Sequence, residues 1–209
     1  MTILPRLFLF AAGVALVACS DPDAARARKT TVPTYDQRTG KLTQLTFDRN
    51  KNGTIDTWTD MDGTRPLRSR VDLDEDGKID RWEYYDAAGN LAKVGFSRAN
   101  NGKADAWAFS DHDGKVARIE ISSTADEHRI DRWEFYENGQ LARVEADSKG
   151  DGRVDRWETY EKGSLKTAAI DENGDGRPDR RLTYDAGVLV AIESEPDAAG
   201  RFTKRVEVK

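Results

Sequence analysis

The chain has 209 residues, of which 34% are charged and 37% hydrophobic, and its formal net charge is −5. This composition is polar for a globular protein but too aromatic for a disordered one, because it includes five Trp, six Tyr and seven Phe. The acidic balance argues against nucleic acid as a partner. The chain has a single cysteine, which excludes an internal disulfide.

The first segment, residues 1–18, is typical of a secretory signal peptide. One arginine precedes an apolar run that is shorter than a transmembrane helix needs. The tetrapeptide that follows is LVAC, residues 16–19, and it resembles the lipobox of bacterial lipoproteins. In that family the signal is cut before the cysteine, whose sulfur receives a diacylglycerol. The resemblance implies lipidation of Cys19. The alternatives are an ordinary signal peptide with a chance cysteine, or an uncleaved anchor.

Residues 19–33 follow as a lipidated tether, because the stretch DPDAARARKTTVP shows no periodicity. Ser20 stands directly after the cysteine. In lipoproteins with a sorting system, Asp at this position tends to retain the protein at the inner membrane, whereas Ser resembles the outer-membrane class. The resemblance therefore implies a protein of the bacterial cell envelope, lipid-anchored at the outer membrane on its periplasmic or surface side.

An internal repeat governs the remainder, residues 34–209. The five tryptophans fall at positions 58, 82, 107, 133 and 157, and Arg181 takes the next slot. Each unit of 24–26 residues has an acidic, Gly-containing loop, an aromatic run, a Gly turn and a second apolar run. Trp82 and Tyr84 show the alternation that places two rings on one face of a strand. A helix of about two turns would be marginal.

The sequence therefore predicts an all-β protein, an antiparallel meander of β-hairpin repeats in an elongated curved or solenoid-like sheet. It leaves open whether the sheet stays open, coils or closes. The units resemble the MORN-like hairpin repeats of bacterial proteins. Trp82, Tyr85, Gly89 and Leu91 match their W-x-x-Y-x-x-x-G-x-L pattern, whereas the third and sixth units depart from it. This resemblance implies a fold more than a function.

The loop at residues 72–83 matches the spacing of an EF-hand calcium loop. Its candidate ligands are Asp72, Asp74, Asp76, the carbonyl of Lys78 and Asp80, with Gly77 at the sharp turn and Glu83 as a weaker twelfth-position ligand. Calcium takes six to eight oxygens at about 2.3–2.6 Å, so a tight loop must aim alternate side chains inward. The strand-like flanks resemble FG-GAP-type loops of the pattern D-x-D-x-D-G-x-x-D, in which Asp80 is the closing ligand. In a strand, Glu83 would point to the face opposite Trp82.

Two further loops keep four candidate calcium ligands each. These are Asp171, Asn173, Asp175 and Asp179 in one loop, and Asp48, Asn50, Asn52 and Asp56 in the other. In the loop at 147–155, Lys149 intrudes at the third position. The alternative is that all these loops are plain turns, since Asp, Asn and Gly favour tight turns without metal. We expect structural Ca²⁺ in several loops.

We expect the tryptophans to form the core of the sheet, because a sheet with both faces solvated would not hold. A sugar-stacking surface is the alternative. The tetrapeptide Asp-Arg-Trp-Glu recurs three times, which argues for cross-strand ladders and against a single active site. The sequence thus predicts a non-enzymatic envelope lipoprotein whose calcium-stabilised repeats act as a scaffold or protein-binding surface. The alternative is a carbohydrate- or peptidoglycan-binding module that uses a Trp face. The expected partners are the membrane, through the lipid anchor, and an envelope protein or glycan.

Overall fold

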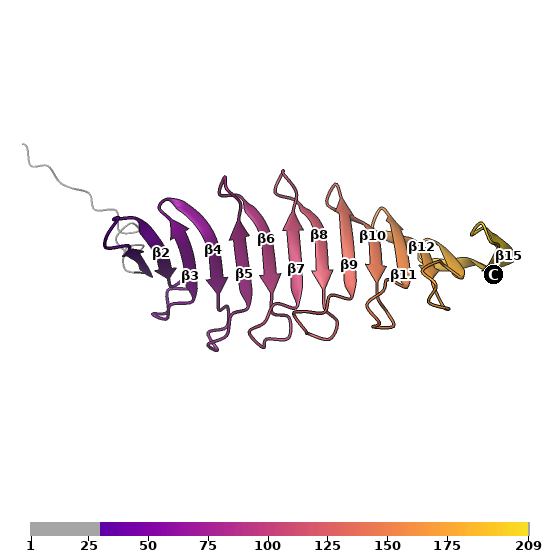
Figure 1. The fold of residues 1–209 in the computed structure, drawn as a ribbon, viewed down its shortest axis with the longest axis horizontal. Helices are drawn as coiled ribbons and strands as arrows, with labels where there is room; N and C mark the ends of the chain where they lie inside the picture. The colour runs from indigo at the N-terminus through magenta and orange to yellow at the C-terminus, as the bar shows by residue number, and fades with distance from the viewer. Residues whose placement is uncertain (1–29, 209) are drawn as a thin grey trace, which may run out of the picture.

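The computed structural model describes residues 30–208, which form one open sheet of antiparallel strands (Figure 1). The strands are β1 (Thr31–Tyr35), β2 (Leu42–Phe47), β3 (Thr57–Asp62), β4 (Arg65–Val71), β5 (Arg81–Tyr85), β6 (Leu91–Phe96), β7 (Ala106–Ser110), β8 (Val116–Ile121), β9 (Arg132–Glu137), β10 (Gln140–Ala146), β11 (Arg156–Glu161), β12 (Ser164–Ile170), β13 (Arg180–Asp185), β14 (Val188–Pro196) and β15 (Phe202–Glu207). Their order in the sheet is their order in the chain. The predicted all-β meander of hairpins is confirmed, and the sheet stays open.

Two kinds of connection alternate along the chain. Six long connections form the loop edge of the sheet, at the bottom of Figure 1. They are the acidic loops 48–56, 72–80, 97–105, 122–131, 147–155 and 171–179. The hairpins between them close with shorter turns at the opposite turn edge. The repeat of the sequence is therefore one acidic loop, one strand, one tight turn and one strand.

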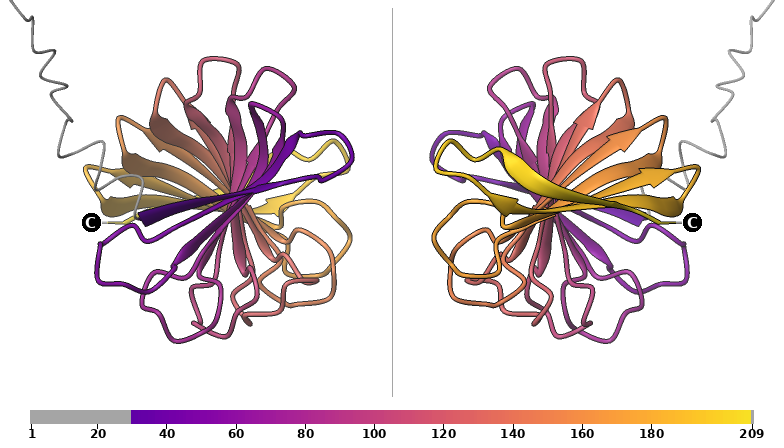
Figure 2. Two further views of the ribbon diagram at one scale, coloured as in Figure 1. Left: turned by 90° about the vertical axis from the view of Figure 1, so that its left-hand side faces the viewer. Right: turned by 90° about the vertical axis from the view of Figure 1, so that its right-hand side faces the viewer.

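The turn edge sets the twist of the sheet. The Asn138-Gly139 turn has positive φ at both residues, 51° and 76°, which is the type I′ geometry that suits a two-residue hairpin. Close to this turn the strand register shifts by one residue, between Leu141 and Arg143, and the hairpin of β5 and β6 has a similar shift between Tyr84 and Tyr85. A bulge of this kind strengthens the right-handed twist. Because the bulge recurs in successive hairpins, the strands fan around the long axis of the molecule (Figure 2).

The strands present two faces, because alternate side chains point to opposite sides. We define the tryptophan face by Trp58, Trp82, Trp107, Trp133 and Trp157, which are joined across the sheet by the intervening residues Arg70, Gly95, Glu120 and Glu145. The other side is the valine face, where the most buried apolar side chains lie. Val71, Val94, Val144 and Ala168 are 0–7% exposed there.

The tryptophans are half-buried, so the expectation that they form a buried core is wrong. Each ring is flanked by side chains of neighbouring strands, but no second layer covers either face of the described sheet. The expectation assumed that a sheet with two solvated faces would not hold. Cross-strand pairs and the aliphatic stems of arginine and lysine supply the missing cover, while their charged ends stay in water.

The predicted signal peptide at 1–18 and the lipidation site Cys19 lie outside the described residues. Strand β1 begins at Thr31, so the last three residues of the predicted tether belong to the sheet. Within residues 30–208, no helix has the length and apolar character needed to cross a membrane.

Candidate functional site

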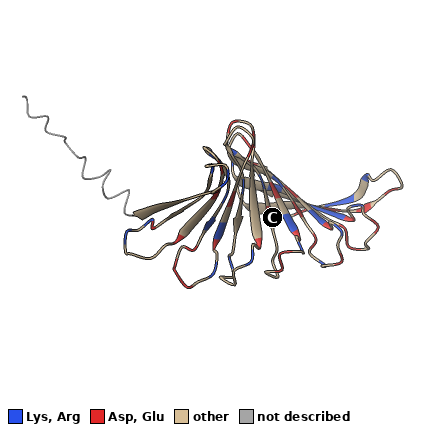
Figure 3. Ribbon diagram, turned by 60° about the vertical axis from the view of Figure 1, so that its left-hand side comes forward, with Lys and Arg blue, Asp and Glu red and all other residues tan. Residues whose placement is uncertain are grey.

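Aspartates at the ends of the acidic loops are the most regular buried groups of the molecule. Eight of them are 2–7% exposed: Asp48, Asp56, Asp72, Asp105, Asp131, Asp147, Asp155 and Asp171. Each begins or ends an acidic loop, where the last aspartate of one loop meets the first residue of the next. The N–H of Asp72, for example, donates to the carbonyl of Asp56 at 2.9 Å. Figure 3 shows acidic residues recurring where the strands meet the loops.

These carboxylates close their loops by accepting backbone N–H groups. Asp147 accepts from Gly150, Asp151 and Gly152 at 2.6–3.1 Å. Asp155 accepts from the N–H groups of Ser148 and Lys149. Burial by itself would raise the pKa of the Asp147 carboxyl, but its three N–H donors outweigh burial and hold that pKa below its usual value. The buried carboxylates of this loop therefore have their hydrogen-bond donors without a metal ion.

The loop at 72–80 differs in a way that suits a cation. Asp72, Asp74 and Asp80 each place a carboxylate oxygen within 4.8 Å of the others. Among the described residues, this is the group of three acidic side chains that lies close enough together to hold a metal ion. Asp72 is 6% exposed. Its Oδ2 accepts from Gly77 N–H at 2.9 Å, whereas its buried Oδ1 has no hydrogen-bond partner. A buried, unpaired carboxylate oxygen is costly unless a cation or donor meets it. The three side chains can hold a metal ion.

Two other predicted ligands of this loop are engaged with each other. Lys78 donates to Asp76 from its backbone N–H at 2.8 Å and from Nζ at 2.7 Å. These bonds hold the pKa of Asp76 below its usual value. Asp76 therefore lies outside the group of three. Glu83 lies on the valine face, opposite Trp82 as expected, where it accepts a hydrogen bond from Tyr85 Oη at 2.6 Å.

The loop at 171–179 brings its predicted ligands together with a different donor set. Asp171 accepts from Gly174 and Gly176 N–H groups at 2.6 and 2.7 Å. The Nδ2 of Asn173 donates to Asp179 Oδ1 at 2.9 Å, so an amide N–H faces that carboxylate. Asp175 accepts the N–H of the residue two positions on, at 2.9 Å. The loop is thus internally paired.

The loop at 48–56 turns its two asparagines away from its own aspartates. The Nδ2 atoms of Asn50 and Asn52 donate to Glu75 in the next loop, at 2.6 and 2.7 Å. Asp48 accepts from three backbone N–H groups of its own loop. Asp56 accepts the neighbouring Thr57 hydroxyl at 2.6 Å. The predicted ligands are close in the chain but serve the loop backbone and the adjacent loop.

Basic side chains clamp neighbouring loops, a role that the sequence reading missed. Lys149 Nζ donates to the carbonyls of Asp171 and Glu172 at 2.7 and 3.1 Å. Arg129 likewise donates to the Gly150 carbonyl in the following loop. A cation from one repeat thus reaches the backbone oxygens of the next. The sequence feature that could have predicted this contact is Lys149 itself, a lysine at a ligand position one repeat ahead of an acidic loop.

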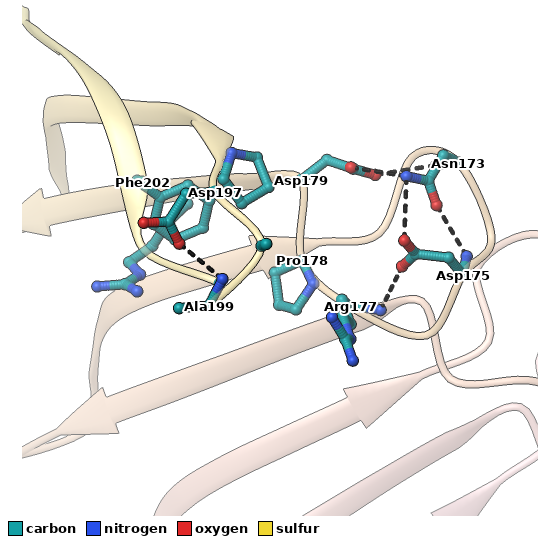
Figure 4. A pocket seen from close by; sticks show the side chains of 12 residues that line it. Asn173, Asp175, Arg177, Pro178, Asp179, Asp197, Ala199 and Phe202 are labelled. Atoms are coloured by element: carbon teal, nitrogen blue, oxygen red, sulfur yellow. Dashed lines mark hydrogen bonds between the residues drawn. The ribbon is translucent and has the colours of Figure 1, made fainter.

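A hollow of about 610 Å³ lies at the C-terminal end, between the 171–179 loop and the β14–β15 turn (Figure 4). Its wall contains Asp175, Asp197, Pro178 and Phe202. Both carboxylates already accept backbone hydrogen bonds within their own segments, Asp197 from Ala199 N–H at 2.9 Å. This hollow offers fewer free acceptors than the group around Asp72.

On the valine face, the residues of the repeated Asp-Arg-Trp-Glu motif form a repeating arrangement. In β11, Arg156 Nε and Tyr160 Oη donate to Glu158 at 2.6 and 2.8 Å. The same arrangement occurs at Arg132, Glu134 and Tyr136, and burial together with the bond to Glu134 raises the pKa of Tyr136 to about 12. These bonds join residues two positions apart in one strand, and the residues opposite Glu158 are Val144 and Ala168. The predicted cross-strand pairing of Arg with Glu is therefore wrong for this motif, although the arrangement does repeat from strand to strand.

No family model matches the chain, and no curated protein matches it. Among solved structures, a mutant of TarM from S. aureus has a TM-score of 0.37 and 10% identity over 50% of this chain. A second TarM structure gives 0.36 and 11% over 50%. A structure of accessory secretory proteins 1, 2 and 3 of Streptococcus pneumoniae gives 0.25 and 12% over 68%. The chain spans 19–22% of those chains, and TM-scores below 0.5 carry no argument about function.

Proposed function

We propose that this chain is a non-enzymatic lipoprotein of the bacterial cell envelope, anchored through Cys19 at the outer membrane, whose sheet is a scaffold or protein-binding surface. The observation that supports a binding role is the open sheet itself, which offers two long uncovered faces. Repeat proteins usually act through extended surfaces of this kind. The threefold recurrence of the Arg-Glu-Tyr arrangement favours a structural role over a catalytic centre, which is normally single.

We propose calcium as the cation of the 72–80 loop. The support is the buried and unpaired Oδ1 of Asp72 beside Asp74 and Asp80. Carboxylate and carbonyl oxygens are the ligands that Ca²⁺ prefers, and the main-chain carbonyl of Lys78 is the further ligand that the loop spacing predicts. Occupation of the loops at 48–56 and 171–179 is part of the same proposal. It requires Asn50, Asn52 and Asn173 to turn their amide oxygens inward.

Calcium in such a loop acts as a clip that fixes one hairpin on the next. Extracellular modules bind calcium with dissociation constants of about 10⁻⁴–10⁻³ M. One such site at ~1 mM calcium stabilises the fold by roughly 0.4–1.4 kcal/mol. For a chain of this size that corresponds to a rise of about 1–5 °C in melting temperature.

The test is a calcium titration of residues 21–209 by calorimetry, with thermal melts in calcium and in chelator. We expect saturable binding and a higher melting temperature in calcium. The variant Asp74→Asn removes one carboxylate of the group of three and abolishes binding at this loop. The matched variant Asp151→Asn alters an exposed aspartate in the loop where Lys149 stands, and it leaves the binding at 72–80 unchanged. If the unmodified protein shows neither a heat of calcium binding nor a change in melting temperature, the calcium proposal is wrong.

A second candidate function is carbohydrate or peptidoglycan binding through the tryptophan face. The specific observation in its favour is that all five tryptophans are half-buried on an uncovered face. Aromatic rings that keep one side accessible can stack on sugar rings. Deep burial of the same rings would have removed this possibility.

A further inference from the structure

The tryptophan face carries a second row of side chains beside the tryptophans. From β3 to β10 this row contains Asp60, Arg68, Tyr84, Lys93, Phe109, Arg118, Phe135 and Arg143, paired strand to strand. Aromatic rings and cations therefore alternate along it. The guanidinium carbon of Arg118 lies 4.4 Å from the centre of the Phe109 ring, and that of Arg143 lies 3.7 Å from the Phe135 ring.

These two rows are basic although the whole chain is acidic. They contain five cations, Arg68, Arg70, Lys93, Arg118 and Arg143, against the carboxylates Asp60, Glu120 and Glu145. The excess is two positive charges on a chain of net charge −5. On the valine face of the same strands, each arginine is balanced by one glutamate: Arg81 by Glu83, and Arg132 by Glu134.

The cations of the tryptophan face are also its more accessible charges. The four arginine side chains are 35–45% exposed, whereas the carboxylates that they contact are 21–28% exposed. A ligand approaching this face meets guanidinium groups first. Asp60 contacts two arginines at once, Arg68 at 2.7 Å and Arg70 at 3.3 Å, so one of them can turn to a ligand at little cost.

Lys93 is the cation of these rows that has no carboxylate partner among the described residues. Its Nζ lies 4.7 Å from the ring centres of both Tyr84 and Trp107. The Trp107 ring lies across Gly95, where a Cβ would come within 2.7 Å of Cζ3. An aromatic platform thus lies beside an ammonium group whose charge is not neutralised.

The spacing of the rings matches a polysaccharide. Tryptophans recur on every second strand, about 9.5 Å apart, which is close to the length of one disaccharide in an extended β-linked chain. We propose that the tryptophan face of β3–β10 binds an acidic polysaccharide that runs across the strands. Its sugar rings stack on the tryptophans, and a carboxylate pairs with Lys93. This inference rests on the second candidate function, glycan binding by the tryptophan face, and names the ligand class.

Charge density favours a polysaccharide over a nucleic acid. Duplex DNA carries one negative charge per ~1.7 Å of axis, and binding it requires many uncompensated cations. The two rows offer an excess of two positive charges, and the acidic loops border the tryptophan face along one edge. A glycan with about one carboxylate per disaccharide fits this sparse pattern, because stacking supplies the remaining contacts.

The test uses the full chain in a neutral detergent, with chelator present so that calcium plays no part. The probe is a hyaluronan oligosaccharide, which carries one carboxylate per disaccharide, and its control is the same oligosaccharide with the carboxylates reduced to alcohols. Calorimetry is expected to show binding that weakens with salt and is weaker for the reduced probe. Lys93→Met is expected to weaken hyaluronan binding about fivefold. Lys115→Met, a turn-edge variant, leaves it unchanged, and thermal melts check that both variants fold.

Equal binding of both probes with no effect of Lys93→Met overturns the acidic-ligand inference but leaves a glycan-binding sheet. Absence of binding to either probe overturns the inference and the glycan-binding candidate function. The calcium proposal is unaffected, because its titration is independent of this face. Binding of an oligonucleotide or acidic peptide in place of hyaluronan, abolished by Lys93→Met, assigns the surface to another class of ligand and also overturns it.

Discussion

The buried carboxylate of Glu158 is stable because it has two side-chain donors. Glu158 is 6% exposed and accepts hydrogen bonds from Arg156 and Tyr160. Burial by itself would raise its pKa, but the bonds from Tyr160 and Arg156 outweigh burial and lower it. Removing one donor leaves the buried charge partly unpaired, which costs more folding free energy than the net value of an ordinary hydrogen bond.

Tyr160→Phe is therefore expected to lower the free energy of unfolding by about 1–3 kcal/mol, measured by denaturant titration. The matched control is Tyr184→Phe in the next repeat. On the same cross-strand row, β13 carries Leu182 where β11 carries Glu158, and the Tyr184 hydroxyl has no partner among the described residues. We expect almost no change there. Equal losses in the two variants would contradict the role given to the Glu158 bond.

At the scale of the element, the acidic loop is a turn closed from both ends by aspartates. Asp171 accepts from Gly174 and Gly176, as Asp147 does from its own loop. In both cases burial raises the carboxyl pKa, but the backbone N–H donors lower it by more, so the pKa lies below its usual value. A backbone hydrogen bond also joins each loop to the following one: the Asp171 N–H, for example, donates to the Asp155 carbonyl at 2.9 Å. Loop closure and strand register are therefore coupled.

These lowered pKa values make the fold sensitive to acid. A carboxyl whose folded pKa lies below the 3.8 of a free aspartate contributes stability that is present above that value and lost as the pH falls through the folded pKa. We expect the melting temperature to fall steeply below about pH 4. The double variant Asp147→Asn and Asp171→Asn keeps one acceptor oxygen per site but cannot be protonated. It should show a shallower fall than the exposed control Asp185→Asn, and parallel curves would refute the assignment.

At the scale of the whole molecule, each strand pairs only with its neighbours in sequence. Such a sheet is quasi-one-dimensional, and its stability is approximately a sum of repeats and their interfaces. The acidic loops lie along one edge and the tight turns along the other, so both faces remain free between the two edges (Figure 1). Length and accessible faces, not an enclosed cavity, are what this architecture offers a partner.

The proposed anchor places this sheet at a membrane through its N-terminal end. Cys19→Ser removes the sulfur that would carry the lipid, so we expect the variant to move from the membrane fraction to the soluble periplasmic fraction of an expressing bacterium. A mass increase on the unmodified protein, absent from the variant, would identify the acyl chains. Retention of the variant in the membrane fraction would point to an uncleaved signal anchor.

The sequence alone determined the hairpin meander and the position of every acidic loop, because strands, Gly turns and Asp-rich loops are local patterns that repeat every two dozen residues. It also placed Glu83 and Trp82 on opposite faces, since alternation along a strand is local. Local patterns determined so much because the fold consists of contacts between sequence neighbours.

Tertiary structure decided the rest. Whether Asp72, Asp74 and Asp80 converge while Asp76 pairs with Lys78 depends on side-chain geometry that spacing cannot specify. The reach of Lys149 to the next loop and the half-burial of the tryptophans depend on how far the sheet twists and on the absence of a second layer over it. These features arise from interactions between repeats, and each repeat looks much the same in sequence whether its face is covered or open.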